Sequence, residues 1–166
     1  LVDFEFTEKW QERWTDWMKP GGHGALADVR NETLALTPLK KPLSECTVAL
    51  LTTGGVHLKS QEPYDVMKAD GDWSLREIPS DTPLGDLMIT HTHYNHIDAD
   101  RDINVVLPIE RLAELRDEGV ISGVAKTHYG MMGWVPNPTV TVRDTVPGIV
   151  EKASAEGVDI ALLTPG

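Results

Sequence analysis

Residues 46–55 read Cys-Thr-Val-Ala-Leu-Leu-Thr-Thr-Gly-Gly, and this stretch decides the fold. Its apolar and β-branched residues run on without polar alternation, which is typical of a strand buried on both faces of a sheet. The two glycines permit a tight turn at the end of the run. We therefore predict a buried strand over 46–53 that ends at Gly54-Gly55.

The rest of the chain alternates short apolar runs with helical patterns. We predict helices over 108–118 and 146–156, short strands over 87–90 and 158–163, and an extended piece over 104–107. The strand over 158–163 is expected to be buried, because it is apolar almost throughout. This alternation favours an α/β fold with a mostly parallel sheet and helices on both faces. In such folds, the functional loops follow the carboxyl ends of the strands.

An amphipathic helix is predicted near the start of the sequence, over residues 7–18. One face of this helix carries the apolar side chains Trp10, Trp14, Trp17 and Met18. The stripe suits docking on the core or on a second subunit, so a homodimer is one of the expected states. Residues 25–44 are expected to form an irregular arm that contains two prolines. The predicted organisation is a helix and arm over 1–44, followed by one compact α/β unit over 45–166.

Composition and charge restrict the possible partners. The 166 residues carry a net charge of −11, which argues against a nucleic-acid partner because phosphates need a basic surface. No apolar run is long enough to cross a bilayer and the first residues lack a secretion-signal pattern, so we expect a cytoplasmic protein without membrane contact. Cys46 is the single cysteine, which fits a reducing compartment and a buried apolar role. A small-molecule substrate or a protein partner is favoured.

Candidate chemistry is concentrated in residues 91–96, which read His-Thr-His-Tyr-Asn-His. Three imidazoles this close together suit a divalent transition metal, with the ligands His91, His93, His96 and Asp98. The same groups suit acid, base and orienting roles around a substrate, with Tyr94 as a substrate contact. In the simplest alternative, the histidines only pair with neighbouring aspartates in a polar loop.

Two further histidines are candidates for the same site. His57 follows the first strand, and a ring at a strand end is expected to face the crevice. His128 is expected to reach the site from another loop, over 127–134. Gly54 and Gly55 offer backbone amides that suit an anion or substrate, although paired glycines after a strand are more often only a turn.

A long polar connection over 61–76 joins two of the apolar runs. Connections of this length often form lids or binding loops. Arg76 is its only arginine and is a candidate clamp for a carboxylate substrate. The plainer interpretation of Arg76 is a surface ion pair.

The histidine segment resembles the HxHxDH motif of the metallo-β-lactamase superfamily, in which these positions hold a two-metal hydrolytic site. Two residues depart from that motif. Asn95 replaces the aspartate that binds the second metal, and Ile97 replaces the usual glycine. This resemblance implies a metal-dependent hydrolase as an alternative function.

A second resemblance covers far more of the chain, from about residue 46 to the end. The matching segments occur in order and resemble the family of glycine/sarcosine/betaine reductase component B and D-proline reductase selenoproteins. They are residues 48–59, 61–65, 70–79, 91–107, 118–123, 127–130 and 157–166. The family cleaves a carbon–nitrogen bond reductively with a selenocysteine or cysteine nucleophile, so the resemblance implies a reductase acting on a C–N or C–S bond, with a thiol as candidate electron donor.

In this family the nucleophile follows directly on the segment that matches residues 163–166. We therefore expect a selenocysteine just beyond Gly166, at a UGA codon read as a stop, or a chain cut at that point. The resemblance implies that the pocket is lined by His57, His91, His93, His96 and His128, with Asp98 and Asp100 orienting imidazoles or joining a metal. Cys46 lies at the opposite end of its strand and is not expected to substitute. A third possible function is a non-catalytic domain that binds a small molecule.

Overall fold

The computed structural model describes residues 37–136 and 138–165. The predicted helix over 7–18, its tryptophan stripe and most of the arm over 25–44 lie outside the described residues. None of the helices in the described part of the chain is long and apolar enough to cross a membrane.

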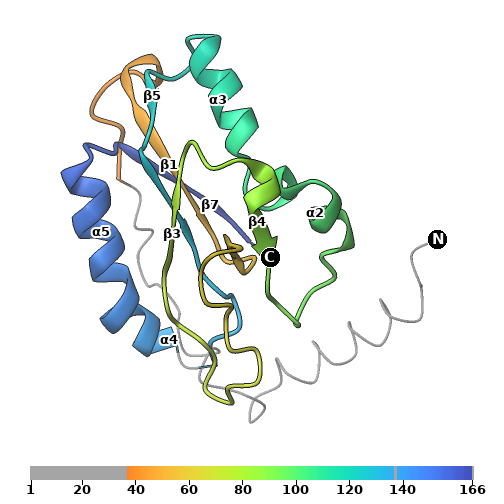
Figure 1. Cartoon of the computed structure of the whole chain (residues 1–166). Helices are drawn as coiled ribbons and strands as arrows, with labels where there is room; N and C mark the ends of the chain where they lie inside the picture. Colours follow the sequence, from red (N-terminus) through yellow and green to blue (C-terminus); the bar gives the residue numbers. More distant parts are fainter. Residues whose placement is uncertain (1–36, 137, 166) are drawn as a thin grey trace, which may run out of the picture.

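The main sheet has five strands and is organised around β1 (Figure 1). One edge of β1 pairs in parallel with β7, whereas its other edge pairs in parallel with β5 near its start and with β6 near its end. β3 pairs antiparallel with β6 at the far side of the sheet. The strands are β1 (Thr47–Thr52), β3 (Arg76–Pro79), β5 (Gly123–Val124), β6 (Thr127–Gly130) and β7 (Ile160–Thr164).

A second sheet and several short helices surround the main sheet. β2 (Val56–Leu58) and β4 (Leu87–Ile89) form an antiparallel pair of their own. The α-helices are α2 (Ile97–Arg101), α3 (Ile109–Asp117), α4 (Pro138–Val140) and α5 (Val146–Ala155), and η4 (Thr141–Thr145) is a π-helical turn. The 3₁₀ helices are η1 (Leu43–Glu45), η2 (Leu84–Asp86) and η3 (Ile103–Val105).

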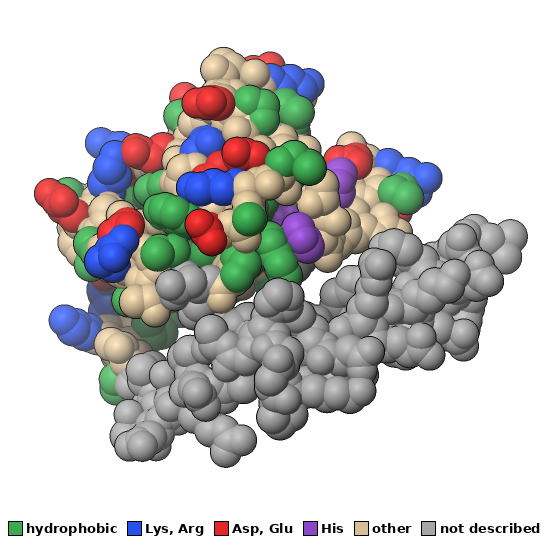
Figure 2. Space-filling model, turned by 90° about the horizontal axis from the view of Figure 1, so that it is seen from below, with side chains coloured by type: hydrophobic (Ala, Val, Ile, Leu, Met, Phe, Trp, Pro, Cys, Tyr) green, Lys and Arg blue, Asp and Glu red, His purple; other side chains and the backbone are tan. Residues whose placement is uncertain are grey.

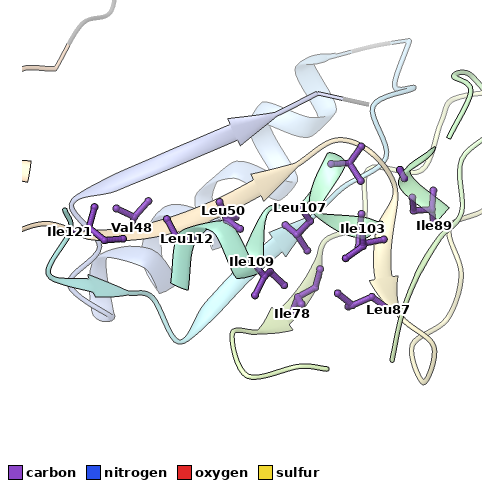
Figure 3. Close-up of a cluster of buried hydrophobic side chains, with 13 residues drawn as sticks. Val48, Leu50, Ile78, Leu87, Ile89, Ile103, Leu107, Ile109, Leu112 and Ile121 are labelled. Carbon is purple, nitrogen blue, oxygen red and sulfur yellow. The ribbon is translucent and has the colours of Figure 1, made fainter. Parts of the chain in front are cut away.

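Two apolar clusters occupy opposite faces of the sheet. Val48 and Leu50 of β1 belong to the cluster that contains Leu112 of α3 (Figure 3). Ala49, the residue between them, belongs to the cluster that contains Ile149 of α5. This alternation follows from the strand period of two, which sends successive side chains to opposite faces. The mixed α/β class and the predictions for β1, α3 and α5 are confirmed.

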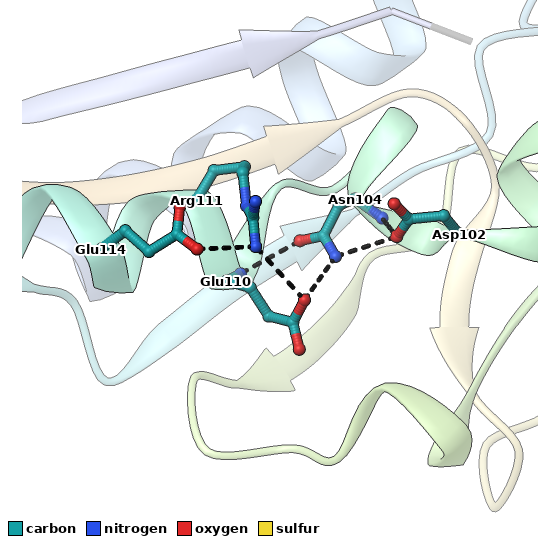
Figure 4. Close-up of polar contacts among 5 residues, drawn as sticks. All are labelled: Asp102, Asn104, Glu110, Arg111 and Glu114. Carbon is teal, nitrogen blue, oxygen red and sulfur yellow. Dashed lines mark hydrogen bonds and ion pairs between the residues drawn. The ribbon is translucent and has the colours of Figure 1, made fainter.

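The predicted extended piece over 104–107 is wrong, because residues 103–105 form η3. A side-chain oxygen of Asp102 accepts the backbone N–H of Asn104 at 3.0 Å, which favours a tight turn at this point. The Asn104 side chain bonds to Asp102 and also accepts the backbone N–H of Glu110 at 3.1 Å (Figure 4). One asparagine therefore supports both η3 and the first turn of α3.

The final strand was expected to be buried, and this expectation is also wrong. β7 is a strand, but Leu162 and Leu163 are 45% and 65% exposed. The apolar composition shows that the side chains of β7 are suited to a core. Whether they are buried depends on which other elements pack over them. In the described residues, the clusters under α3 and α5 cover β1 but leave the middle of β7, residues 161–163, exposed.

Gly130 at the end of β6 is required by a close backbone approach. A Cβ at this position would lie 2.0 Å from the carbonyl oxygen of Val56. We expect Gly130→Ala to reduce the free energy of unfolding by about 3 kcal/mol or more, because both β6 and the β1–β2 turn would have to shift. Urea denaturation measures this loss.

The matched control is Gly85→Ala, because a Cβ at Gly85 meets nothing within 4 Å. Similar unfolding free energies for the two variants would contradict the importance of this contact.

Candidate functional site

The loops that follow β1 and β6 meet the end of β7 at one edge of the sheet. The N–H of Gly55 donates to the carbonyl of Met131 at 2.9 Å, and Gly54 forms a bridge with Met132. The N–H of Thr53 donates to the carbonyl of Thr164 at 3.0 Å. These are the carboxyl ends of parallel strands, where α/β folds bind their ligands.

The histidine loop over 90–96 lies directly on the Gly54-Gly55 turn. The N–H of Thr90 donates to the carbonyl of Gly55 at 2.9 Å, and the hydroxyl of Tyr94 donates to the carbonyl of Gly54 at 2.8 Å. Gly55 has a φ of +73°, and a Cβ there would lie 2.5 Å from the carbonyl oxygen of Thr90. The paired glycines thus allow the turn to lie beneath the histidine loop.

The rings of this loop form a cluster that extends to Trp134. The His91 ring lies edge-on to Tyr94 with centroids 4.8 Å apart, and Tyr94 lies 5.5 Å from His96. His93 stacks on Trp134 at 4.2 Å with an interplanar angle of 7°. His91 is buried whereas His93 is exposed, and Figure 2 shows histidine side chains at the surface of the molecule. The sequence gives no local signal for this stack, because Trp134 lies 41 residues after His93.

Burial sets the electrostatics of the cluster. Desolvation lowers the pKa of His91 to about 4, and the nearby His93 and His96 add to this effect. Burial also raises the pKa of Tyr94 to about 12. Because Nδ1 of His91 accepts the N–H of His93 at 3.0 Å, the neutral His91 ring carries its proton on Nε2. At neutral pH, His91 is therefore a hydrogen-bond donor through Nε2.

His96 is arranged differently from His91. Its Nδ1 lies 2.8 Å from Oδ2 of Asp100, one helical turn further along the chain. A carboxylate at this position favours the proton on Nδ1 and leaves Nε2 available as an acceptor. The expected orienting role of Asp100 toward an imidazole agrees with this contact.

His57 was expected to face the crevice, but the structure buries it completely within β2. Its Nδ1 donates to the carbonyl of Leu58 at 2.8 Å, and its Nε2 accepts from the hydroxyl of Thr90 at 2.8 Å. Both ring nitrogens are therefore used. This geometry gives His57 a positioning role, because Thr90 directly precedes His91.

His128 was expected to reach the site from a loop, but it lies in β6 and is fully buried. Its Nδ1 accepts the backbone N–H of Leu50 at 3.1 Å, in the place that a strand carbonyl would take between β5 and β6. Burial lowers the pKa of His128 to about 4, against a smaller opposing effect of Glu156. The ring thus completes the pairing of the sheet.

Arg76 has most of its donors committed to the connection over 61–76. Its Nε donates to the carbonyl of Glu62 at 3.0 Å, and its Nη1 donates to the hydroxyl of Ser74 at 2.8 Å. The guanidinium also lies 4.5 Å from the centroid of the Tyr64 ring. The geometry makes Arg76 an anchor of the connection, and a carboxylate clamp at Arg76 stays a prediction.

The four predicted metal ligands do not converge. Asp98 pairs with Arg101 at 3.1 Å, and His96 is paired with Asp100. Over residues 37–136 and 138–165, no three His, Cys, Asp or Glu side chains lie close enough together to hold a metal ion. This arrangement does not fit a metal centre.

Comparison with known proteins finds a matching family and three relatives. The family model for glycine/sarcosine/betaine reductase selenoprotein B matches residues 29–166. The D-proline reductase subunit gamma of Acetoanaerobium sticklandii is 38% identical over 130 residues, which cover 78% of this chain and 52% of that protein. The glycine reductase complex component B subunit gamma of Carboxydothermus hydrogenoformans is 31% identical over 136 residues, which cover 76% of this chain and 29% of that protein.

A third relative is the betaine reductase complex component B subunit beta of Peptoclostridium acidaminophilum. It is 28% identical over 127 residues, which cover 75% of this chain and 29% of that protein. The chain thus spans from about half to less than a third of the length of these relatives. No solved structure matches the chain.

The buried His128 predicts a pH-dependent stability. Its pKa of about 4 in the folded protein is lower than the ordinary value of 6.5, so between these pH values the unfolded chain binds a proton that the folded chain does not. Stability from this residue is complete above pH 6.5 and is lost as the pH falls toward 4, by up to about 3 kcal/mol. Urea denaturation across this pH range measures the loss.

The test variant is His128→Asn, whose side-chain oxygen is able to accept the Leu50 N–H but does not titrate. We expect a shallower fall of stability with acid in the variant, by about one proton. Measurement at pH 8 is the control, because it reports the loss of packing alone. An unchanged pH slope would contradict the assignment.

Proposed function

This chain belongs to the glycine/sarcosine/betaine reductase selenoprotein B family, and from that premise we propose that it forms the substrate pocket of a reductase subunit. The reaction proposed is the reductive cleavage of a carbon–nitrogen bond in a small amine substrate. The names of the relatives describe D-proline, glycine and betaine reductases.

One observation supports the proposal: Thr164 and the histidine loop both hydrogen-bond to the turn that follows β1. Thr164 accepts the N–H of Thr53 and donates its hydroxyl to the carbonyl of Val106 at 2.6 Å. Tyr94 bonds to the carbonyl of Gly54, the residue next to Thr53. A nucleophile that follows Gly166 would therefore start from the edge of the sheet on which the histidine loop lies.

The residues present suit the proposed chemistry. A selenolate or thiolate attacks the substrate carbon, so that a Se–C or S–C bond forms as the C–N bond breaks and the amine leaves. One thiol of a dithiol then attacks the selenium or sulfur, the carbon leaves and takes up a proton, and the second thiol releases the nucleophile as the disulfide forms. The net reaction breaks one C–N bond, forms one C–H and one N–H bond, and oxidises the dithiol to a disulfide. The Nε2–H of His91 is available to hydrogen-bond the substrate. Nε2 of His96 is available to accept a proton from the dithiol and pass it to the leaving amine, with Asp100 on Nδ1.

We also propose that the nucleophile is a selenocysteine or cysteine of the intact subunit and is not Cys46. Cys46 does not suit this role, because it is fully buried and its thiol donates to the carbonyl of Pro42 at 3.3 Å. It also precedes β1, whereas the proposed pocket follows β1.

The test begins with the gene, by sequencing the codon after Gly166 and the frame beyond it. The extended protein, with cysteine at that position, then replaces the gamma subunit in the D-proline reductase of A. sticklandii. We expect amine or ring-opened product only with the extended protein and a dithiol. Betaine and sarcosine are assayed as further substrates.

In the same assay, His91→Ala is expected to lower turnover by about 100-fold or more, because proton transfer and hydrogen bonding at the reacting group contribute that much. Thr92→Ala, at the exposed neighbouring position, is the matched control. Equal loss in both variants would count against His91. Two tightly bound metal ions per chain would favour the hydrolase alternative, and ligand binding without turnover would favour a non-catalytic domain.

A further inference from the structure

Strand β7 is paired along only one edge. All five of its residues pair with β1, from Ile160 opposite Val48 to Thr164 opposite Thr52. Within residues 37–136 and 138–165, no strand pairs with its other edge. The backbone groups along that edge are therefore open to a further strand.

The middle of β7 is also uncovered on both faces, whereas Ile160 at its start packs against the cluster under α3. Leu163 pairs with Leu51, which packs in the cluster under α5, yet Leu163 is 65% exposed. Leu162 pairs with Leu50, which is fully buried in the cluster under α3, yet Leu162 is 45% exposed. Each helix thus covers the β1 residue and leaves its β7 partner open. On α5, Val150 is also exposed, at 57%.

This open strand lacks the features that protect natural edges. Edge strands commonly carry charged residues, prolines or bulges that prevent further pairing. From Ile160 to Thr164, β7 has no charged residue, and Pro165 comes only after its end. Asp159 before the strand is neutralised by Lys41 at 2.8 Å. The surface therefore has the chemistry of a sheet interior.

We propose that β7 is an internal strand of the intact reductase subunit, and that its free edge and faces receive a strand and helix from the additional polypeptide that the relatives possess. The matched region is only 52% of the D-proline reductase subunit gamma and 29% of the other two relatives. Their remaining length is ample for a further strand–helix unit. This inference rests on the proposed function for the existence of the extended protein.

A second copy of the chain is a less suitable occupant. Two β7 strands paired edge to edge would lengthen the sheet, but this pairing alone would bring no helix over Leu162 or Leu163. A parallel strand is normally covered on both faces, and a strand–helix continuation supplies the pairing and the cover together.

The test is the reactivity of a thiol placed on β7, measured with a maleimide. Leu163→Cys is compared in the 166-residue chain and in the extended protein, with serine in place of every cysteine beyond Gly166. Met67→Cys is the control, because Met67 is 87% exposed and lies in the connection before β3. Cys46 is buried and contributes little background.

We expect the thiol of Leu163→Cys to react readily in the 166-residue chain, and at least about tenfold more slowly in the extended protein, as burial protects a group until local opening. The reactivity of Met67→Cys should be the same in both. Fast reaction of Leu163→Cys in a folded extended protein would overturn the proposal. Protection already in the 166-residue chain would also overturn it, with a second copy as the occupant if dilution removes the protection and residues 1–36 if it does not.

The two proposals fail in different ways. Reductase activity is measured on the extended protein that keeps its nucleophile, because the serine substitutions of the thiol test remove it. If that protein has no reductase activity while the thiol of Leu163→Cys is protected, the proposed function is refuted and this inference stands. If the extended protein is an active reductase but the thiol of Leu163→Cys reacts fast in it, this inference is refuted and the proposed function stands.

Discussion

Backbone segments approach one another at Gly55 and Gly130 more closely than any side chain permits. At Gly130 the carbonyl oxygen of Val56 occupies the place of a Cβ, and at Gly55 the carbonyl of Thr90 lies almost as close. These contacts hold the turn after β1 between β6 on one side and the histidine loop on the other. The candidate site therefore depends on glycine at these two positions, where no Cβ is tolerated, as much as on the imidazoles.

The elements that could be predicted from the sequence are those whose pattern is local. A continuous apolar run predicted β1, and helical periodicity with suitable ends predicted α3 and α5. β6 was not predicted, because its residues Thr-His-Tyr-Gly have no strand pattern. Their place in the sheet depends on distant groups, above all on the Leu50 N–H, which is 78 residues from the His128 ring that accepts it.

The candidate site could be predicted in position but not in the roles of its residues. Residues 91–96 and the Gly54-Gly55 turn were candidates for one site, and the structure brings them into contact. An imidazole is able to bond a backbone group, another side chain or a substrate, and sequence alone does not show which partner is near. His57 and His128 bond within the protein, His93 stacks on Trp134, and His91 keeps its Nε2–H on the side away from its backbone bond.

The pairing of β1 has a consequence for how the protein is made. All three parallel partners of β1 come later in the chain, and the one that pairs along most of its length, β7, begins 112 residues after Val48. During synthesis on the ribosome, the apolar strand therefore emerges long before its neighbours exist. Strand pairing between such distant residues is slow. Until it occurs, apolar side chains and unpaired backbone groups are exposed and favour aggregation. We expect the nascent chain to rely on chaperones that hold residues 46–53 until residues 160–164 have left the ribosome.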